Sequence, residues 1–140
     1  MSDYKLQILS IPENLNLVEK MIDELREKHN IGVDCYGNML VALTEAVNNA
    51  IHHGNGSNPE KKVNIKCGCK NGTLYFHITD EGVGFDYYNL PDPTAPENIE
   101  KPSGRGIFLM KHLSDQLIFS DNGRTIEMHF RAVNEETVNS

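Results

Sequence analysis

LTEAVNNAIHHG, residues 43–54, predicts the later half of an amphipathic helix that runs to about His53 and stops at Gly54. Its apolar residues recur with the 3.6-residue period of a helix that packs against a core. Glu45, Asn49 and His53 follow one another at intervals of four residues. On a helix these three side chains form one polar line beside the apolar face. The stretch is therefore a candidate functional element as well as a core element.

The polar side chains of this helix suit phosphate chemistry. A neutral Asn oxygen can take one coordination position of Mg²⁺ when phosphates fill others, and a Glu carboxylate can accept a proton from a hydroxyl or from water. Taken alone, a Glu-x-x-x-Asn pair more often simply faces solvent. Histidines at a helix end are often surface residues that the helix dipole favours. The rest of the chain has to distinguish these interpretations.

TDEGVGFD, residues 79–86, closes a predicted strand. Gly82 and Gly84 would let the backbone pass close to a ligand, and Asp80 could accept a hydrogen bond from an exocyclic amine such as that of adenine. A calcium loop, a tight hairpin and a Rossmann turn are the alternatives. Glycines stand where calcium would need oxygen ligands, and the GxGxxG of a Rossmann turn is absent, but a mere turn stays open.

SGRGIFLM, residues 103–110, places Gly104 and Gly106 just before a predicted helix. Backbone amides at a helix start bind anions, and glycine lets a phosphate approach them closely. Arg105 could add positive charge at the same place. The alternative is a loop that ends in a helix cap with a solvated arginine. A Walker A loop is absent from the chain, which argues against a P-loop nucleotide site.

The order of the predicted elements indicates an α/β (α+β) two-layer sandwich. It runs strand, two helices, two strands, a long loop, a helix and two strands. The strands are joined mainly by hairpins, signalled by Asn-Gly at 71–72 and 122–123, which favours an antiparallel or mixed sheet with helices on one face. We expect one domain over residues 1–140, with a frayed polar tail at 132–140.

Composition narrows the class of protein. The chain has 140 residues, of which 39% are hydrophobic, and a net charge of −7, so direct binding of nucleic acid is not expected. We find no signal peptide and no apolar run of about 18 residues, and therefore expect a cytoplasmic protein without membrane contact.

Cys35, Cys67 and Cys69 lack further close metal ligands and are expected to be reduced thiols.

Glu-x-x-x-Asn on a helix, Asp-x-Gly-x-Gly after a strand, a long loop and Gly-x-Gly at a helix, in that order, resemble the GHKL superfamily of ATP-binding proteins. That superfamily includes gyrase-type ATPases, sensor histidine kinases and heat-shock chaperones. The resemblance covers residues 4–131 and is closest to the bacterial anti-sigma-factor serine/threonine kinases, through ALTEAVNNAIHHG, DEGVGFD and GRGIFLMKHLSD. It implies the Bergerat ATP-binding fold, a mixed, mostly antiparallel sheet under helices.

The resemblance also implies a role for each motif. Glu45 would be the catalytic base, and Asn49 would bind the Mg²⁺ that bridges the ATP phosphates. Asp80 would hydrogen-bond the adenine amino group, and residues 86–103 would form the ATP lid. The other candidate nucleotide-binding residues are His53, Gly82, Gly84, Gly104, Arg105, Gly106 and Thr125.

Two positions depart from the family pattern. Many members carry Asn where Glu81 stands, and the charge of Glu81 has no role in the pattern. Arg124 separates Gly123 from Thr125, where the family has a plain Gly-Thr pair, which puts the Thr125 assignment in doubt.

The resemblance implies an ATP-dependent protein serine/threonine kinase that acts as an anti-sigma factor. The γ-phosphate of ATP would pass to a serine of a STAS-type anti-anti-sigma partner, with ATP and Mg²⁺ as cofactors. A sigma factor and a second copy of the chain would be the other partners. Two alternatives stay open: a nucleotide-gated protein-interaction module without phosphotransfer, and a stand-alone histidine-kinase-type catalytic domain.

Overall fold

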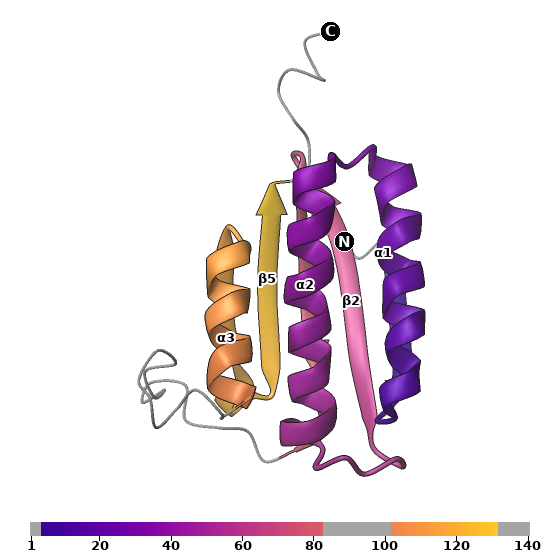
Figure 1. Cartoon of the computed structure of the whole chain (residues 1–140), viewed down its shortest axis with the longest axis vertical. Coiled ribbons are helices and arrows are strands. Elements are labelled where there is room, and N and C mark those ends of the chain that lie inside the picture. The colour runs from indigo at the N-terminus through magenta and orange to yellow at the C-terminus, as the bar shows by residue number, and fades with distance from the viewer. Residues whose placement is uncertain (1–3, 83–101, 132–140) are drawn as a thin grey trace, which may run out of the picture.

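Three helices cover one face of a five-stranded sheet (Figure 1). The computed structural model describes residues 4–82 and 102–131, without side chains at 102–104. The strands are β1 (Tyr4–Leu9), β2 (Lys62–Lys70), β3 (Thr73–Thr79), β4 (Gln116–Ser120) and β5 (Thr125–Arg131). The helices are α1 (Leu15–His29), α2 (Val33–Asn49) and α3 (Pro102–Leu113), with short helical turns at η1 (Pro12–Asn14), η2 (Ala50–Gly54) and η4 (Asp121–Gly123). The predicted order of elements is confirmed.

The strands lie in the order β1-β2-β3-β5-β4, and all four pairings among the described strands are antiparallel. The prediction had also allowed a mixed sheet. Both predicted hairpins are present. Asn71 and Gly72 have φ values of 53° and 80°, the left-handed conformation that a two-residue hairpin turn requires. The second hairpin joins β4 to β5 through η4, where Asn122 is also left-handed, with φ 57°.

The core lies between the sheet and the helices. Alternate residues of the strands point towards the helices and are buried, as the two-residue period of a strand requires. On β3 and β5, two of the three inner strands, the buried side chains are Leu74, Phe76, Ile78, Ile126, Met128 and Phe130. Residues of the opposite parity, such as His77 and Glu127, are half-exposed on the open face of the sheet. One continuous core therefore connects the five strands and α1, α2, α3 and η2.

Helix α2 lies centrally over the sheet, between α1 and α3 (Figure 1). It continues beyond Asn49 as η2, a wider π-helical turn that ends at Gly54, near the predicted helix end. The start of α3 differs from the prediction. The helix already begins at Pro102, so Gly104 and Gly106 lie within it and not before it, and the last two residues of the expected lid are helical. Proline is favoured in the first turn of a helix, because its ring presets φ and the missing N–H has no helical partner there.

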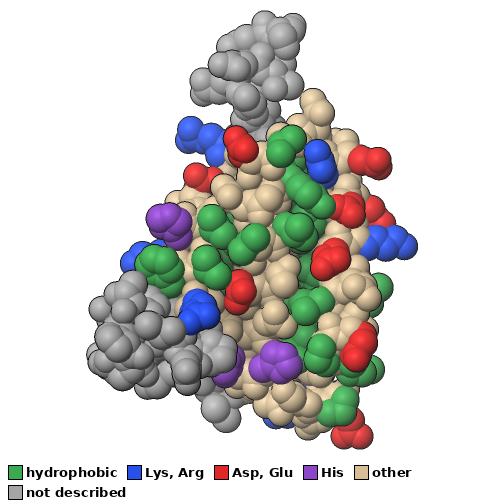
Figure 2. Space-filling view, in the orientation of Figure 1, with side chains coloured by type: hydrophobic (Ala, Val, Ile, Leu, Met, Phe, Trp, Pro, Cys, Tyr) green, Lys and Arg blue, Asp and Glu red, His purple; other side chains and the backbone are tan. Residues whose placement is uncertain are grey.

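Acidic side chains are prominent on the α1 side of the helical face (Figure 2). The exposed acidic residues of α1 are Glu19, Asp23, Glu24 and Glu27. Within residues 4–82 and 102–131, no helix is both long and apolar enough to cross a membrane.

Candidate nucleotide-binding site

Glu45 and Asn49 of α2 meet Gly106 of α3 at the phosphate end of the candidate site. A Cβ atom placed on Gly106 would lie 2.9 Å from Glu45 Oε2 and 3.1 Å from Asn49 Nδ2. Such distances leave no room for a side chain at position 106 without displacing the carboxylate. The one-turn spacing of Glu45 and Asn49 therefore places both against the backbone of a helix that begins more than fifty residues later.

The Asn49 carboxamide is unusual because its Nδ2 atom is buried without a hydrogen-bond partner among the described residues. A buried amide group of this kind is costly unless something satisfies it. Asn49 supplies a neutral amide oxygen, a hard oxygen donor of the type that Mg²⁺ accepts, and it thus fits a magnesium ion whose other ligands come from phosphates and water. In the described part of the chain no three His, Cys, Asp or Glu side chains form a metal cluster.

Asp80 follows β3 directly and packs on two glycines. A Cβ atom on Gly54, at the end of η2, would overlap the Asp80 carboxylate. A Cβ atom on Gly82 would overlap the Gly54 carbonyl. The Gly82 N–H donates to Asp80 Oδ1 at 2.7 Å, which holds the carboxylate in place. Both glycines are needed for close approach, and neither shows the left-handed φ that would demand glycine for conformational reasons.

Burial raises the pKa of the half-buried Asp80 carboxyl above its ordinary value. The hydrogen bond from the Gly82 N–H and the positive charges of Arg124 and Lys61 oppose this rise, and the charge of Asp121 adds slightly to it. A desolvated carboxylate of this kind gains from any ligand that donates a hydrogen bond to it. An exocyclic amine is such a donor.

Asn55, which the sequence did not single out, is the buried polar centre of this region. Its side chain donates to Ser10 Oγ at 2.9 Å and to the Lys62 carbonyl at 3.0 Å, and its Oδ1 accepts from the Glu81 N–H at 2.7 Å. The Glu81 carboxylate in turn accepts from the Lys62 N–H. Glu81, whose charge had no role in the family pattern, thus ties the turn after β3 to the first residue of β2.

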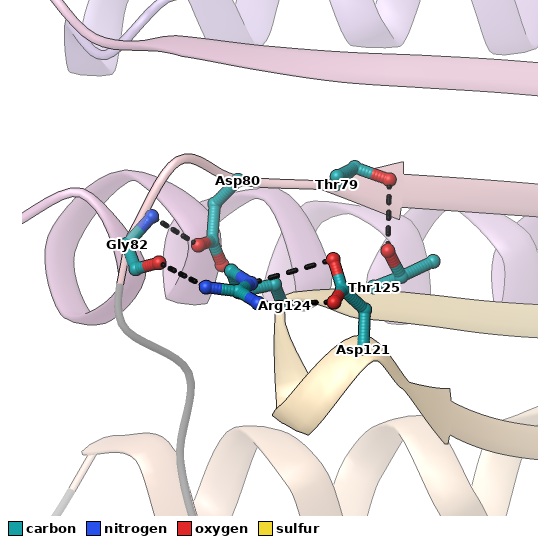
Figure 3. Close-up of polar contacts among 6 residues, drawn as sticks. All are labelled: Thr79, Asp80, Gly82, Asp121, Arg124 and Thr125. Atoms are coloured by element: carbon teal, nitrogen blue, oxygen red, sulfur yellow. Dashed lines mark hydrogen bonds and ion pairs between the residues drawn. The ribbon is translucent and has the colours of Figure 1, made fainter.

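Arg124 is brought to Asp80, and Thr125 is not. The Asp80 N–H donates to the Arg124 carbonyl at 3.0 Å, and the Arg124 guanidinium lies close enough to lower the pKa of Asp80 (Figure 3). Strand alternation places Thr125 on the opposite face from buried Ile126, where its hydroxyl lies 3.1 Å from Thr79 Oγ1. Thr125 thus contacts the residue before Asp80, and its place near adenine stays a prediction.

The remaining candidates fall into two groups. His53 is exposed in η2, whose π turn rotates less per residue than an α-helix and does not simply continue the Glu45–Asn49 line. Gly104 lies in the first turn of α3, and Arg105 is exposed beside Gly106. The predictions that lie outside the described residues are Gly84, residues 86–101 of the lid and the tail at 132–140.

The two parts of the site are spaced along one helical axis. Glu45 lies in α2, and Gly54 ends the π turn η2, which continues α2, nine residues later.

Three residues of the site escaped prediction, for different reasons. Gly54 was interpreted only as a helix stop, although a glycine that follows a polar helix face is also compatible with close approach to another chain segment. The contacts that bring Asn55 and Arg124 to the turn after β3 have no local signal, because Glu81 and Gly82 lie 26 and 42 residues away from them in sequence. Arg124 was noticed only as a departure from a pattern.

Comparison with known proteins identifies the family. The family model described as histidine kinase-like ATPase domain matches residues 8–130. A protein named serine-protein kinase RsbW from Oceanobacillus iheyensis is 24% identical over 147 aligned positions, which cover 99% of this chain and 93% of that protein. Proteins of the same name from Bacillus cereus and Bacillus licheniformis are each 25% identical, covering 89% and 84% of this chain and 81% and 78% of their own lengths. Because that family model matches most of its length, the chain belongs to the histidine kinase-like ATPase domain family.

Proposed function

We propose that this protein is an ATP-dependent serine/threonine protein kinase and anti-sigma factor. In this proposal it transfers the γ-phosphate of Mg-ATP to a serine of a STAS-type anti-anti-sigma protein in the cytoplasm, and it binds a sigma factor as a homodimer. The observation that carries the kinase part is the convergence of Glu45, Asn49 and Gly106. The relatives named serine-protein kinase support the same activity.

Each group has a chemical task in this proposal. Asp80 accepts a hydrogen bond from the adenine amine, and the bare Gly106 backbone leaves room for phosphate oxygens. Bound Mg²⁺, held through Asn49, would neutralise phosphate charge. Transfer of a phosphoryl group depends mainly on positioning and electrostatic stabilisation, and the protein's own contribution is to hold donor and acceptor in line.

Glu45 is the group placed to take the proton of the acceptor. The serine oxygen forms a bond to the γ-phosphorus, the bond from that phosphorus to the β–γ bridging oxygen breaks, and ADP leaves. The hydroxyl proton passes to a Glu45 carboxylate oxygen. A module that only binds nucleotide needs no such base, so Glu45 distinguishes a kinase from a nucleotide-gated binding protein.

The test is a transfer assay with Mg-ATP and a STAS-type protein from the same genome, followed by mass spectrometry of that protein. We expect Glu45→Ala to retain ATP affinity within about threefold and to lower the transfer rate by 10² or more, roughly the contribution of a general base. Asn49→Ala should lose Mg-dependent nucleotide binding.

Three outcomes would contradict parts of the proposal. Equal transfer by Glu45→Ala removes Glu45 as the base. Tight ATP binding with no phosphoserine on the partner favours the binding module. Phosphate recovered on a histidine would instead support a histidine-kinase-type catalytic domain.

A further inference from the structure

We propose that Arg124 is a positioning residue that fixes the Asp80 carboxylate for recognition of adenine, so that it sets the preference of this protein for adenine over guanine nucleotides. This inference rests on the proposed function, because it concerns the nucleotide that the same site takes. Arg124 stands between Gly123 and Thr125, where the family has a plain Gly-Thr pair. The contacts of its side chain and main chain indicate what this extra residue does.

The Arg124 side chain connects two turns that are far apart in sequence. Its Nε donates to Asp121 Oδ2 at 3.3 Å, and its Nη2 donates to Asp121 Oδ1 at 3.0 Å. Its Nη1 donates to the Gly82 carbonyl at 3.5 Å. Figure 3 shows the guanidinium between the Asp121 carboxylate and the Gly82 backbone. The hairpin turn before β5 is thereby tied to the turn that follows β3.

The main chain of Arg124 makes a second connection to the same turn. Its carbonyl accepts from the Asp80 N–H at 3.0 Å, while the Gly82 N–H donates to Asp80 Oδ1 at 2.7 Å. The turn from Asp80 to Gly82 is thus held at its first N–H and at its last carbonyl by one arginine. Because the Asp80 carboxylate also packs on Gly54, any shift of this turn moves the carboxylate relative to α2.

The shape of the arginine side chain is essential to this arrangement. Two parallel hydrogen bonds to one carboxylate orient a guanidinium in its plane, which a lysine ammonium cannot reproduce. Asp121 lies in η4 with a left-handed φ of 52°, and the Arg124 N–H donates to its carbonyl at 3.1 Å. The hydrogen bonds between Arg124 and Asp121 therefore form inside one short turn. They leave Nη1 of Arg124 free to donate to the Gly82 carbonyl.

The positive charge of Arg124 also favours the ionised form of Asp80, the form that accepts a hydrogen bond. Burial disfavours the ionised form of Asp80, whereas Arg124, Lys61 and the Gly82 N–H favour it, and Asp121 disfavours it slightly. An ionised carboxylate accepts a hydrogen bond from the exocyclic amine of adenine. Guanine presents a carbonyl oxygen at the corresponding ring position, and that oxygen is repelled by the same carboxylate. A site built for a hydrogen bond discriminates strongly against a ligand that cannot make it.

The experiment compares Mg-ATP with Mg-GTP on the full-length protein, by calorimetric binding and by transfer kinetics. We expect Arg124→Gln to reduce the ATP over GTP preference about tenfold, with KM for ATP raised and kcat within about twofold, because the distant phosphate end is untouched. Arg124→Lys should recover only part of the preference. Arg131→Gln, at the other end of β5, is the matched control and should leave both nucleotides unaffected.

Measuring the ATP over GTP preference as a function of pH adds a second test. A residue that only stabilised the fold would not change the pH at which this preference is lost. Removing the Arg124 charge raises the pKa of Asp80 further, so the ATP over GTP preference should be lost at a higher pH in Arg124→Gln than in the wild type. The triphosphate titrates alike in both nucleotides, so its effect cancels in the ratio. If Arg124→Gln does not fold, Arg124→Lys keeps the positive charge but not the two parallel hydrogen bonds to Asp121, and it tests the loss of preference at constant pH.

The inference is overturned if the variants that fold keep both the wild-type preference and its pH midpoint. That result would leave the proposed function intact, provided that the wild type binds ATP and that Asp80→Asn loses the preference. Failure of the wild type to bind either nucleotide would instead remove the proposed function itself.

Discussion

At position 106 the space is too small for any side chain beyond a hydrogen atom. A methyl group there would contact Glu45 Oε2 at 2.9 Å and Asn49 Nδ2 at 3.1 Å. A helix interior normally favours alanine over glycine, so glycine at this position works against local helix stability. Its presence is explained by the space that it leaves between α2 and α3.

Gly106→Ala should therefore separate stability from function. We expect it to leave the free energy of unfolding unchanged or raise it by up to about 1 kcal/mol, since alanine stabilises helices. At the same time it should weaken Mg-ATP binding and slow transfer, because the Glu45 carboxylate must move. Thermal unfolding and calorimetric binding would measure the two effects on one sample.

Gly37→Ala is the matched control for this substitution. Gly37 lies within α2, and a Cβ atom there would have no neighbour within 4 Å. It should give the gain in stability without the loss of binding. If Gly106→Ala binds ATP as the wild type does, the space beside Glu45 is not used by the nucleotide.

At the scale of elements, the junction after α2 holds the site together. The π turn η2 brings Asn55 into the interior, where the Asn55 N–H donates to the Ala50 carbonyl five residues earlier, at 2.8 Å. From there the Asn55 side chain reaches the chain just after β1, the first residue of β2 and the turn after β3. π turns are frequent at functional sites, and here the turn positions a residue that no regular helix would have placed there.

Asn55→Ala should destabilise the fold substantially. It would leave the Glu81 N–H, the Ser10 hydroxyl and the Lys62 carbonyl without their partner, and we expect a loss of about 3 kcal/mol in the free energy of unfolding. Denaturant titration measures this loss. Asn64→Ala removes an exposed bond from Gln7 and should cost well under 1 kcal/mol, so similar losses for the two variants would contradict the argument.

The open face of the sheet carries a second element-scale feature, a carboxylate between two imidazoles. Glu127 of β5 accepts from His77 Nε2 at 2.8 Å, and its other oxygen contacts His129. Burial alone would raise the pKa of Glu127, but the hydrogen bonds from His129 and His77 outweigh it, so the pKa lies below its ordinary value of 4.5.

The sign of the resulting pH dependence follows from linkage. A carboxyl with a lowered folded-state pKa stabilises the fold above its unfolded pKa, and this contribution is lost as pH falls through the lower folded value. The stability advantage of the wild type over Glu127→Gln should therefore be present above pH 4.5 and shrink below it. Unfolding titrations across that range test this. Glu60→Gln at an exposed position is the control, and an advantage that does not change with pH would contradict the assignment.

On the scale of the whole molecule, the net negative charge of the protein opposes the binding of a negatively charged nucleotide. Twenty acidic residues against thirteen basic ones give a net charge of −7, which repels a nucleoside triphosphate at long range. In the proposed function, binding would therefore depend on local groups, namely the bare backbone at Gly106, the amide of Asn49 and the cation that accompanies the nucleotide.

The sequence by itself determined the order of the elements, the two hairpins, the facing of helices on one side of the sheet and the pairing of Glu45 with Asn49. These features depend on periodicity and on turn chemistry, which act between residues a few positions apart. The start of α3 was misplaced because its glycines suggested a turn. Packing against α2, where glycine provides close approach, overrode their low helix propensity.

Only the tertiary structure decided that Gly54 lies under Asp80, that Asn55 joins three chain segments and that Arg124, not Thr125, stands beside Asp80. The contacts of Asp80 with Gly54 and Arg124 and of Asn55 with Glu81 join segments at least 26 residues apart, and such contacts form only when the sheet register and the π turn are both in place. Arg124 lies at the end of η4 with φ −73° and ψ −22°, and its side chain reaches the Gly82 carbonyl, while strand alternation in β5 places Thr125 on the face opposite to buried Ile126. No local sequence signal records this difference, because it depends on how the β4–β5 hairpin packs on the turn after β3.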